Sequence, residues 1–286
     1  MKRRTLRTLV AVLAVSILFP ALSFAQEVTL DVSVSKPWLL AGTNQVAYLK
    51  VALTGFEMAS NRERTPVNVA IVLDRSGSMD GEKIVRAREA ARMAVALLDA
   101  RDIVSIVTYS DTVSVLVPST RASDHTYIQD RIDSIRADGS TALFAGVSKG
   151  AEELRKFFDD NRVNRVILLS DGLANVGPDS PASLGDLGAS LRKSGISVTT
   201  IGLGLGYNED LMVRLAEKSD GNHAFVENSR DLARIFEYEF DDILSVVAQD
   251  VEIEIRCGDG VRPLRVLGRE SEIYGRTVVT SINPLY

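Results

Sequence analysis

One stretch of the chain joins an almost unbroken apolar run to a cluster of oxygen-bearing side chains: Val67-Asn68-Val69-Ala70-Ile71-Val72-Leu73-Asp74-Arg75-Ser76-Gly77-Ser78. A short continuous apolar run predicts a strand buried on both faces, as in the middle of a parallel sheet. Asp74 then stands at the carboxyl end of this strand, the edge where ligands bind in open α/β sheets. A helix is predicted next, because apolar residues from Ile84 to Leu98 recur at helical spacing.

Two further loops supply oxygens of the same kind. Thr141 follows Asp138-Gly139-Ser140 directly before a helical pattern, and Asp171 follows a second apolar run at residues 166–170. Carboxylate and hydroxyl oxygens are the ligands that hard cations such as Mg²⁺ prefer. A doubly wound fold places the carboxyl ends of its parallel strands at one sheet edge, so we expect these loops to meet there.

The middle of the chain alternates between strand and helix patterns. Strands are predicted at residues 67–73, 103–109, 112–117, 163–170, 197–203 and 222–226, and helices at 84–98, 126–135, 142–158, 182–193, 209–218 and 232–247. The strand at 112–117 is expected to pair with its predecessor as an antiparallel edge. This alternation predicts an α/β fold: a doubly wound, mostly parallel sheet with helices on both faces.

The motifs identify a family. Asp-x-Ser-x-Ser after a buried strand, a distant threonine, and Ser-Asp-Gly after another buried strand together resemble the von Willebrand factor type A (VWA) domain. The resemblance covers residues 66–247 and implies an intact metal-ion-dependent adhesion site (MIDAS). The residues that it implies are Asp74, Ser76, Ser78, Thr141 and Asp171. The alternative, that these are ordinary turn and cap residues, does not explain the joint pattern.

The resemblance also implies how the site works. The cation would be Mg²⁺, Mn²⁺ or Ca²⁺. The three hydroxyls would coordinate it directly, while the two carboxylates mainly hold metal-bound water and orient the serines. Neutral ligands leave the charge of the cation poorly compensated, so a carboxylate from a partner protein can take the remaining position.

Two features beside the motif have competing interpretations. Asp80 follows the motif closely; it is interpreted as the cap of the next helix, with a ligand role for a metal as the alternative. Gly202-Leu203-Gly204-Leu205-Gly206 has the wrong spacing for a dinucleotide-binding loop. It is predicted to form a flexible rim loop near the edge of the site.

Both ends of the α/β region are predicted to be β-structured. The N-terminal flank, residues 26–60, shows the alternation of half-exposed antiparallel strands from residue 28 to residue 54. The C-terminal flank, residues 248–286, carries three strand patterns, at 251–255, 264–268 and 276–282. Neither flank has enough strands to be stable alone, so together they are expected to complete a small β-sandwich-like unit. This resembles the strands that flank the domain in bacterial exported members, and the C-terminal flank is interpreted as a short or truncated one.

The first residues are predicted to be a targeting segment. Basic residues from Lys2 to Arg7 precede an apolar run at 9–18 and the small-x-small site Ser23-Phe24-Ala25. A signal peptide over residues 1–25 makes the protein exported: periplasmic, secreted or on a bacterial cell surface. An uncleaved anchor is the alternative, and no later stretch is predicted to span a membrane.

Composition excludes several classes of function. The formal net charge is −5, and no basic cluster lies outside the N-terminus, so no nucleic-acid partner is expected. The single cysteine, Cys257, cannot form an internal disulfide. His125 and His223 lie far apart, and neither stands in an H-E-x-x-H motif; G-x-S-x-G and P-loop motifs are also missing.

We therefore expect a binding protein rather than an enzyme, with a divalent cation that captures an Asp or Glu of a partner protein. A metal-stabilised structural or assembly component of a cell-envelope complex is the alternative. A metal-dependent hydrolase ranks last, because the sequence offers no general base for it.

Overall fold

The computed structural model describes residues 28–38, 40, 42–54, 64–172, 174–246, 251–267 and 271–282. The predicted signal peptide, residues 1–25, lies outside the described residues, as do the segments 55–63 and 283–286. None of the helices in the described part of the chain is long and apolar enough to cross a membrane.

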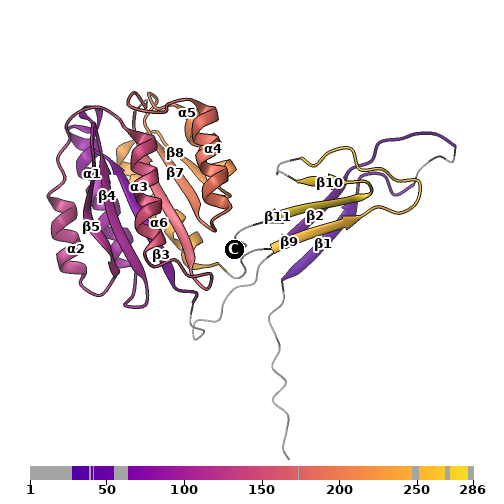
Figure 1. Cartoon of the computed structure of the whole chain (residues 1–286), viewed down its shortest axis with the longest axis horizontal. Helices are drawn as coiled ribbons and strands as arrows, with labels where there is room; N and C mark the ends of the chain where they lie inside the picture. Colours follow the sequence, from indigo (N-terminus) through magenta and orange to yellow (C-terminus); the bar gives the residue numbers. More distant parts are fainter. Residues whose placement is uncertain are drawn as a thin grey trace, which may run out of the picture.

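A six-stranded sheet forms the centre of the α/β region (Figure 1). Its order is β5-β4-β3-β6-β7-β8, and only β4 and β5 pair antiparallel. The strands are β3 (Val67–Asp74), β4 (Ile103–Tyr109), β5 (Val113–Arg121), β6 (Val163–Ser170), β7 (Ser197–Leu203) and β8 (His223–Val226). Every residue of β3 and β6 is buried, as their apolar runs predict for central strands.

Helices cover both faces of this sheet, which confirms the predicted doubly wound class. The helices are α1 (Glu82–Ala96), α2 (His125–Asp133), α3 (Leu143–Arg155), α4 (Pro181–Arg192), α5 (Glu209–Lys218) and α6 (Leu232–Leu244). Alternate residues of β3 enter two separate cores. Ile71 packs in a core with residues of α1, α2 and α6, whereas Val72 packs in a core with residues of α3, α4 and α5.

The two flanks form antiparallel sheets outside the six-stranded one (Figure 1). In the N-terminal flank, β1 (Thr29–Val34) pairs with β2 (Leu49–Thr54). In the C-terminal flank the order is β10-β11-β9, with β9 (Val251–Arg256), β10 (Glu272–Tyr274) and β11 (Thr277–Ile282). The predicted antiparallel strands of the N-terminal flank are thus present, as are those predicted at residues 251–255 and 276–282.

One predicted strand of the C-terminal flank is wrong. Residues 264–267 form no strand, and Leu264 is 67% exposed, so no sheet face buries it. Pro263, directly before this stretch, has no N–H to donate to a ladder. The third strand is β10 instead, because Gly275 adopts φ 60° in a two-residue turn that pairs Tyr274 with Thr277.

Candidate metal centre

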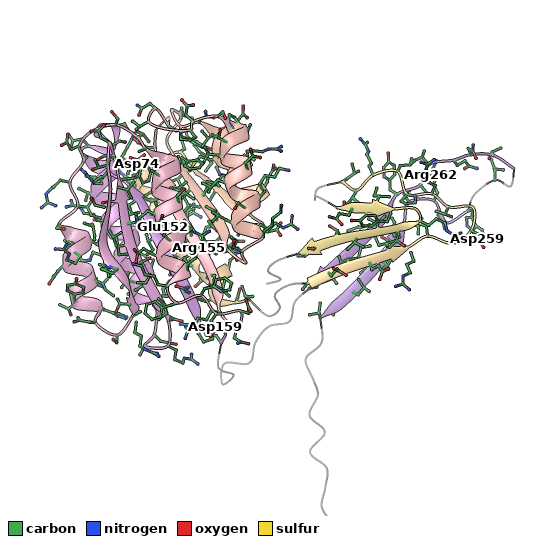
Figure 2. The ribbon with its side chains drawn as sticks, in the orientation of Figure 1. Asp74, Glu152, Arg155, Asp159, Asp259 and Arg262 are labelled. Atoms are coloured by element: carbon green, nitrogen blue, oxygen red, sulfur yellow. The ribbon has the colours of Figure 1, made fainter. Side chains whose placement is uncertain are left out.

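The carboxyl edge of the sheet brings the three motif loops together. β3 ends at Asp74, and its neighbour β6 ends at Ser170, one residue before Asp171. Thr141 lies on the loop that enters α3. Figure 2 shows Asp74 near this end of the sheet and Asp159 near the opposite end. The strand order therefore brings three positions that are far apart in the sequence together at one site.

Local hydrogen bonds fix the carboxylate of Asp74. Its side chain is buried, and its Oδ1 accepts the backbone N–H of Ser76 at 2.8 Å, the turn that Asp readily forms with the residue two positions on. Its Oδ2 accepts the hydroxyl of Ser170 at 2.6 Å. The hydroxyl of Tyr109 lies 3.4 Å from the same oxygen. Oδ1 is thus oriented by the loop after β3, and Oδ2 by residues of β4 and β6.

The two serines connect Asp74 with Asp171. Ser76 Oγ and Ser78 Oγ lie 3.1 Å apart, and Ser78 Oγ donates to Asp171 Oδ1 at 2.7 Å. The short 3-10 turn η1 (Gly77–Met79) places the second serine next to the other loop.

Thr141 is positioned by a residue that sequence reasoning missed. Its backbone N–H donates to Asn175 Oδ1 at 2.8 Å, and the N–H of Asn175 donates back to Thr141 O at 3.1 Å. This reciprocal pair ties the loop before α3 to the loop after β6. No motif marks Asn175; its position four residues after Asp171 is the only sequence signal.

A test of fit comes from Gly172. A Cβ added there would lie 3.4 Å from Thr141 Oγ1, 3.5 Å from Ser78 Oγ and 3.9 Å from Asp74 Oδ2. Oxygens from all three loops therefore surround one small space that a side chain at position 172 would enter. The structure brings all five predicted residues to this place, and their donor set, two carboxylates and three hydroxyls, suits a hard divalent cation.

The described residues contain no group of three or more His, Cys, Asp or Glu side chains that could hold a metal ion. A cation at this edge would therefore depend on hydroxyl oxygens as well as on the two carboxylates. Oxygen donors of this kind suit a hard cation.

Burial sets the electrostatics of the centre. Desolvation raises the pKa of Asp74 above its ordinary value, opposed by the hydrogen bonds from Ser170 and Ser76; the nearby charge of Asp171 raises it further. Burial also raises the pKa of Tyr109 well above 10, so its hydroxyl remains a donor. Two buried carboxylates this close repel each other, and a bound cation would relieve this repulsion.

A lysine reaches the centre from α1. Lys83 Nζ forms an ion pair with Asp171 Oδ2. This residue was not among those predicted from the sequence. The available signal was a lysine directly before the predicted helix at residues 84–98, a position where the helix dipole disfavours a positive charge.

The predicted cap role of Asp80 is wrong. Asp80 is the C-cap of η1, and the N-cap of α1 is Gly81, which adopts φ 80° and makes no side-chain cap bond. A non-helical residue with positive φ is needed between the 3-10 turn and the helix, and glycine adopts that conformation without strain.

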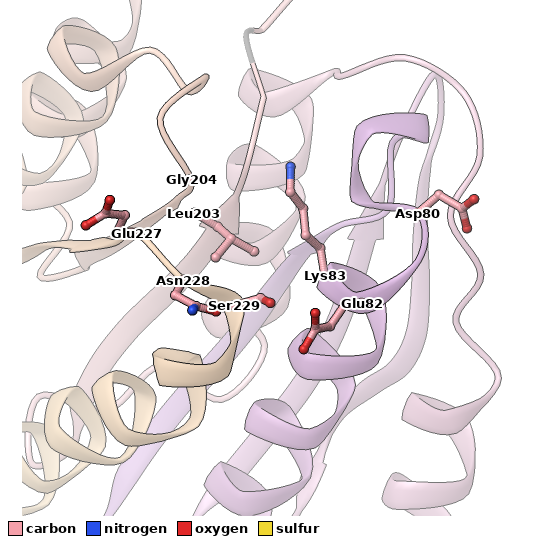
Figure 3. Close-up of a pocket in the computed structure, with 8 residues that line it drawn as sticks. All are labelled: Asp80, Glu82, Lys83, Leu203, Gly204, Glu227, Asn228 and Ser229. Atoms are coloured by element: carbon pink, nitrogen blue, oxygen red, sulfur yellow. The ribbon is translucent and has the colours of Figure 1, made fainter.

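A hollow of about 640 Å³ lies beside Lys83 (Figure 3). It is lined by Asp80, Glu82, Lys83, Leu203, Gly204, Glu227, Asn228 and Ser229. Of the glycine-rich segment predicted as a loop, Gly202 and Leu203 instead end strand β7, and only residues 204–206 lie beyond the strand. Leu203 and Gly204 line this hollow, which lies beside Lys83.

A model of the von Willebrand factor type A domain matches residues 68–237 of this chain. The uncharacterised protein YfbK of Escherichia coli (strain K12) is 32% identical over 237 residues, which are 82% of this chain and 40% of YfbK. The chain spans a similar share, 41%, of the uncharacterised protein sll0103 of Synechocystis. This chain thus covers about two fifths of the length of these relatives.

Solved structures share the fold. A von Willebrand factor type A protein from Catenulispora acidiphila superposes with a TM-score of 0.72 at 18% identity, over 92% of this chain and 63% of that chain. The likeness therefore extends into the flanks. Proximal thread matrix protein 1 from the mussel byssus, solved with a zinc-occupied MIDAS motif, has a TM-score of 0.52 at 22% identity, over 62% of this chain and 45% of that chain.

Proposed function

Since the chain belongs to the von Willebrand factor type A domain family, whose members commonly mediate protein–protein interaction, we propose that it captures an acidic residue of a partner protein through a divalent cation. The residues that would hold the cation are Asp74, Ser76, Ser78, Thr141 and Asp171. The domain is proposed to cover residues 66–247, with the two β flanks beside it. Domains of this family typically bind a divalent metal at the MIDAS.

The observation that carries this proposal is the convergence at Gly172. Oxygens of Thr141, Ser78 and Asp74 lie within 3.4 to 3.9 Å of one point beside its Cα. Neutral hydroxyls would leave a bound cation electron-poor, able to accept a carboxylate oxygen. The protein's own contribution is to orient the two serines through Asp74 and Asp171, which accept hydrogen bonds from Ser76 N–H and Ser78 Oγ.

Calorimetric titration of Mg²⁺ and Mn²⁺ into chelator-stripped protein tests the cation. Saturable binding is expected in the wild type and not in the Ser76→Ala/Ser78→Ala variant. A matched control is Ser190→Ala/Ser194→Ala, which removes two exposed hydroxyls on and just after α4. Equal binding by both double variants would refute the assignment of the site.

Carboxylate capture needs a second experiment. The protein is applied to an array of peptides in which each Asp or Glu peptide is matched by its Asn or Gln counterpart. Retention on acidic members only, in Mg²⁺ and not in chelator, is the expected result. Cation binding without any preference for acidic peptides would instead favour a structural role for the metal.

Export is part of the proposal and rests on the pattern of residues 1–25. Expression of the full chain in a bacterial host, with fractionation and N-terminal sequencing, tests it. A mature chain that begins at Gln26 outside the cytoplasm is expected. An intact N-terminus in the membrane fraction would favour the anchor.

A further inference from the structure

Lys83 contacts the candidate metal centre although it is not one of the five oxygen donors. Its ammonium pairs with Asp171 Oδ2, while Ser78 Oγ donates to the other oxygen of the same carboxylate. The side chain of Asp171 is 0% exposed, and that of Lys83 is 38% exposed. One partner is thus fixed inside the site, whereas the other is a long side chain at the surface.

The place of Lys83 on its helix is unfavourable by itself. It is the second residue of α1 (Glu82–Ala96), and a positive charge in the first turn opposes the helix dipole. Local helix energetics therefore do not account for a cation here. The buried carboxylate of Asp171, which needs a positive partner, does account for it.

The hollow beside the centre offers this ammonium a second place. Asp80, Glu82 and Glu227 line it together with Lys83 (Figure 3). Glu82 already pairs with arginines, through Arg86 and Arg230. In the part of the chain that the structure describes, no salt bridge engages Asp80 or Glu227. A lysine side chain that turns away from Asp171 therefore enters a hollow whose lining includes three carboxylates.

We infer that Lys83 is an exchangeable counter-ion that competes with the divalent cation for Asp171. This inference rests on the proposed function, since it needs a cation at the same five residues. The ammonium brings one positive charge to one carboxylate. A divalent cation brings two charges to a space shared by Asp74 and Asp171, so it displaces the ammonium once its concentration is high enough. Lys83 thereby sets the concentration at which the site fills.

Substitution of Lys83→Met tests this competition by calorimetric titration of Mg²⁺. The variant is expected to bind Mg²⁺ more tightly than the wild type by on the order of tenfold, since a charge within about 4–6 Å of a carboxylate commonly shifts its proton affinity by one to three powers of ten. Lys83→Arg keeps the charge and is expected to bind like the wild type. Lys149→Met removes an exposed lysine that pairs with Glu152 on α3, and serves as the matched control.

Thermal unfolding supplies a readout that does not depend on a partner protein. In chelator, Lys83→Met is expected to melt below the wild type, because Asp171 has lost its counter-ion. In saturating Mg²⁺ the difference is expected to close, because the cation replaces the lost charge. Lys83→Gln, which retains a hydrogen-bond donor, is the substitute if the methionine variant does not fold.

The outcomes separate this inference from the proposed function. If the wild type binds Mg²⁺ and Lys83→Met binds it equally or more weakly, the counter-ion role is overturned, but the metal site is still supported. A melting difference that persists in saturating Mg²⁺ would make the pair a purely structural salt bridge and also overturn it. If neither protein binds Mg²⁺, both the inference and the cation site are wrong.

Discussion

Ser170 and Asp74 are joined across the β3–β6 strand pair by a hydrogen bond of 2.6 Å from the hydroxyl Oγ to the carboxylate Oδ2. Both residues are buried, so water does not replace this donor when it is lost. Ser170→Ala is therefore expected to lower the free energy of unfolding by about 1–3 kcal/mol. Mg²⁺ binding should weaken as well, because Asp74 loses one of its orienting contacts. Urea unfolding and calorimetry measure the two effects.

The control for this prediction is another buried serine. Ser105 Oγ on β4 is buried and has no hydrogen-bond partner among the described residues. Removing an unsatisfied hydroxyl costs no hydrogen bond, so Ser105→Ala is expected to leave stability unchanged or slightly raised. If both serine variants lost the same stability, the hydrogen bond to Asp74 would not be the cause.

Gly172→Ala tests the small space enclosed by the three loops. The added Cβ meets Thr141 Oγ1 at 3.4 Å, an ordinary van der Waals distance, so the fold should tolerate it. The methyl group nevertheless enters the space between the oxygens. Mg²⁺ affinity is therefore expected to fall at least about tenfold, by roughly 1.4 kcal/mol or more, with a change in melting temperature of only a few degrees in chelator.

Gly258→Ala is the matched control, because a Cβ at Gly258 meets no atom within 4 Å. This variant should bind Mg²⁺ as the wild type does. Wild-type affinity in Gly172→Ala would show that no cation occupies the space beside this residue.

His223 predicts a pH dependence of stability. Burial lowers its pKa below the ordinary 6.5, and its two ring nitrogens lie 2.9 Å from Thr200 Oγ1 and 3.1 Å from the hydroxyl of Tyr207. Thr200 Oγ1 donates to Met212 O, so it accepts from Nδ1–H, and Nε2 accepts from Tyr207. The native state therefore favours the neutral ring, and protonation is easier in the unfolded chain.

The sign follows from proton linkage. The neutral ring of His223 contributes to the free energy of unfolding above pH 6.5, its pKa in the unfolded chain. This contribution is lost as the pH falls through the lower pKa of His223 in the native state. In His223→Gln this contribution is missing. The difference in unfolding free energy between wild type and variant should thus shrink on acidification, in urea titrations at a series of pH values. A difference that stays constant across the series would contradict the prediction.

Sequence patterns sufficed where neighbouring residues decide the structure. The apolar runs of β3 and β6 predicted central strands. The alternation of strands and helices predicted a doubly wound sheet, with Asp74 and Asp171 at the same edge. The contacts that Lys83, Asn175 and Tyr109 make at that edge could not be predicted in this way. Each of them contacts a residue far away in the sequence. The hydrophobic pattern of one segment carries no information about which distant residue it will contact.

Turn chemistry explains the errors. The apolar stretch at 264–267 matched a strand pattern, but the two-residue turn at Gly275 decides which residues pair in the C-terminal flank. Similarly, aspartate is a favoured cap in general, but the positive φ at Gly81 moves the start of α1 past Asp80. In both places a glycine conformation, rather than hydrophobic pattern, decides the boundary.

The bond between Ser78 and Asp171 joins residues that are 93 positions apart in the chain. An unfolded chain does not hold two such positions together, so a cation that needs both binds the folded protein alone. Above its dissociation constant, each tenfold increase in free cation would then add about 1.4 kcal/mol to the free energy of unfolding. The folding equilibrium would thereby depend on the concentration of divalent cation around the protein. The chain would then survive proteolysis longer at higher cation concentrations.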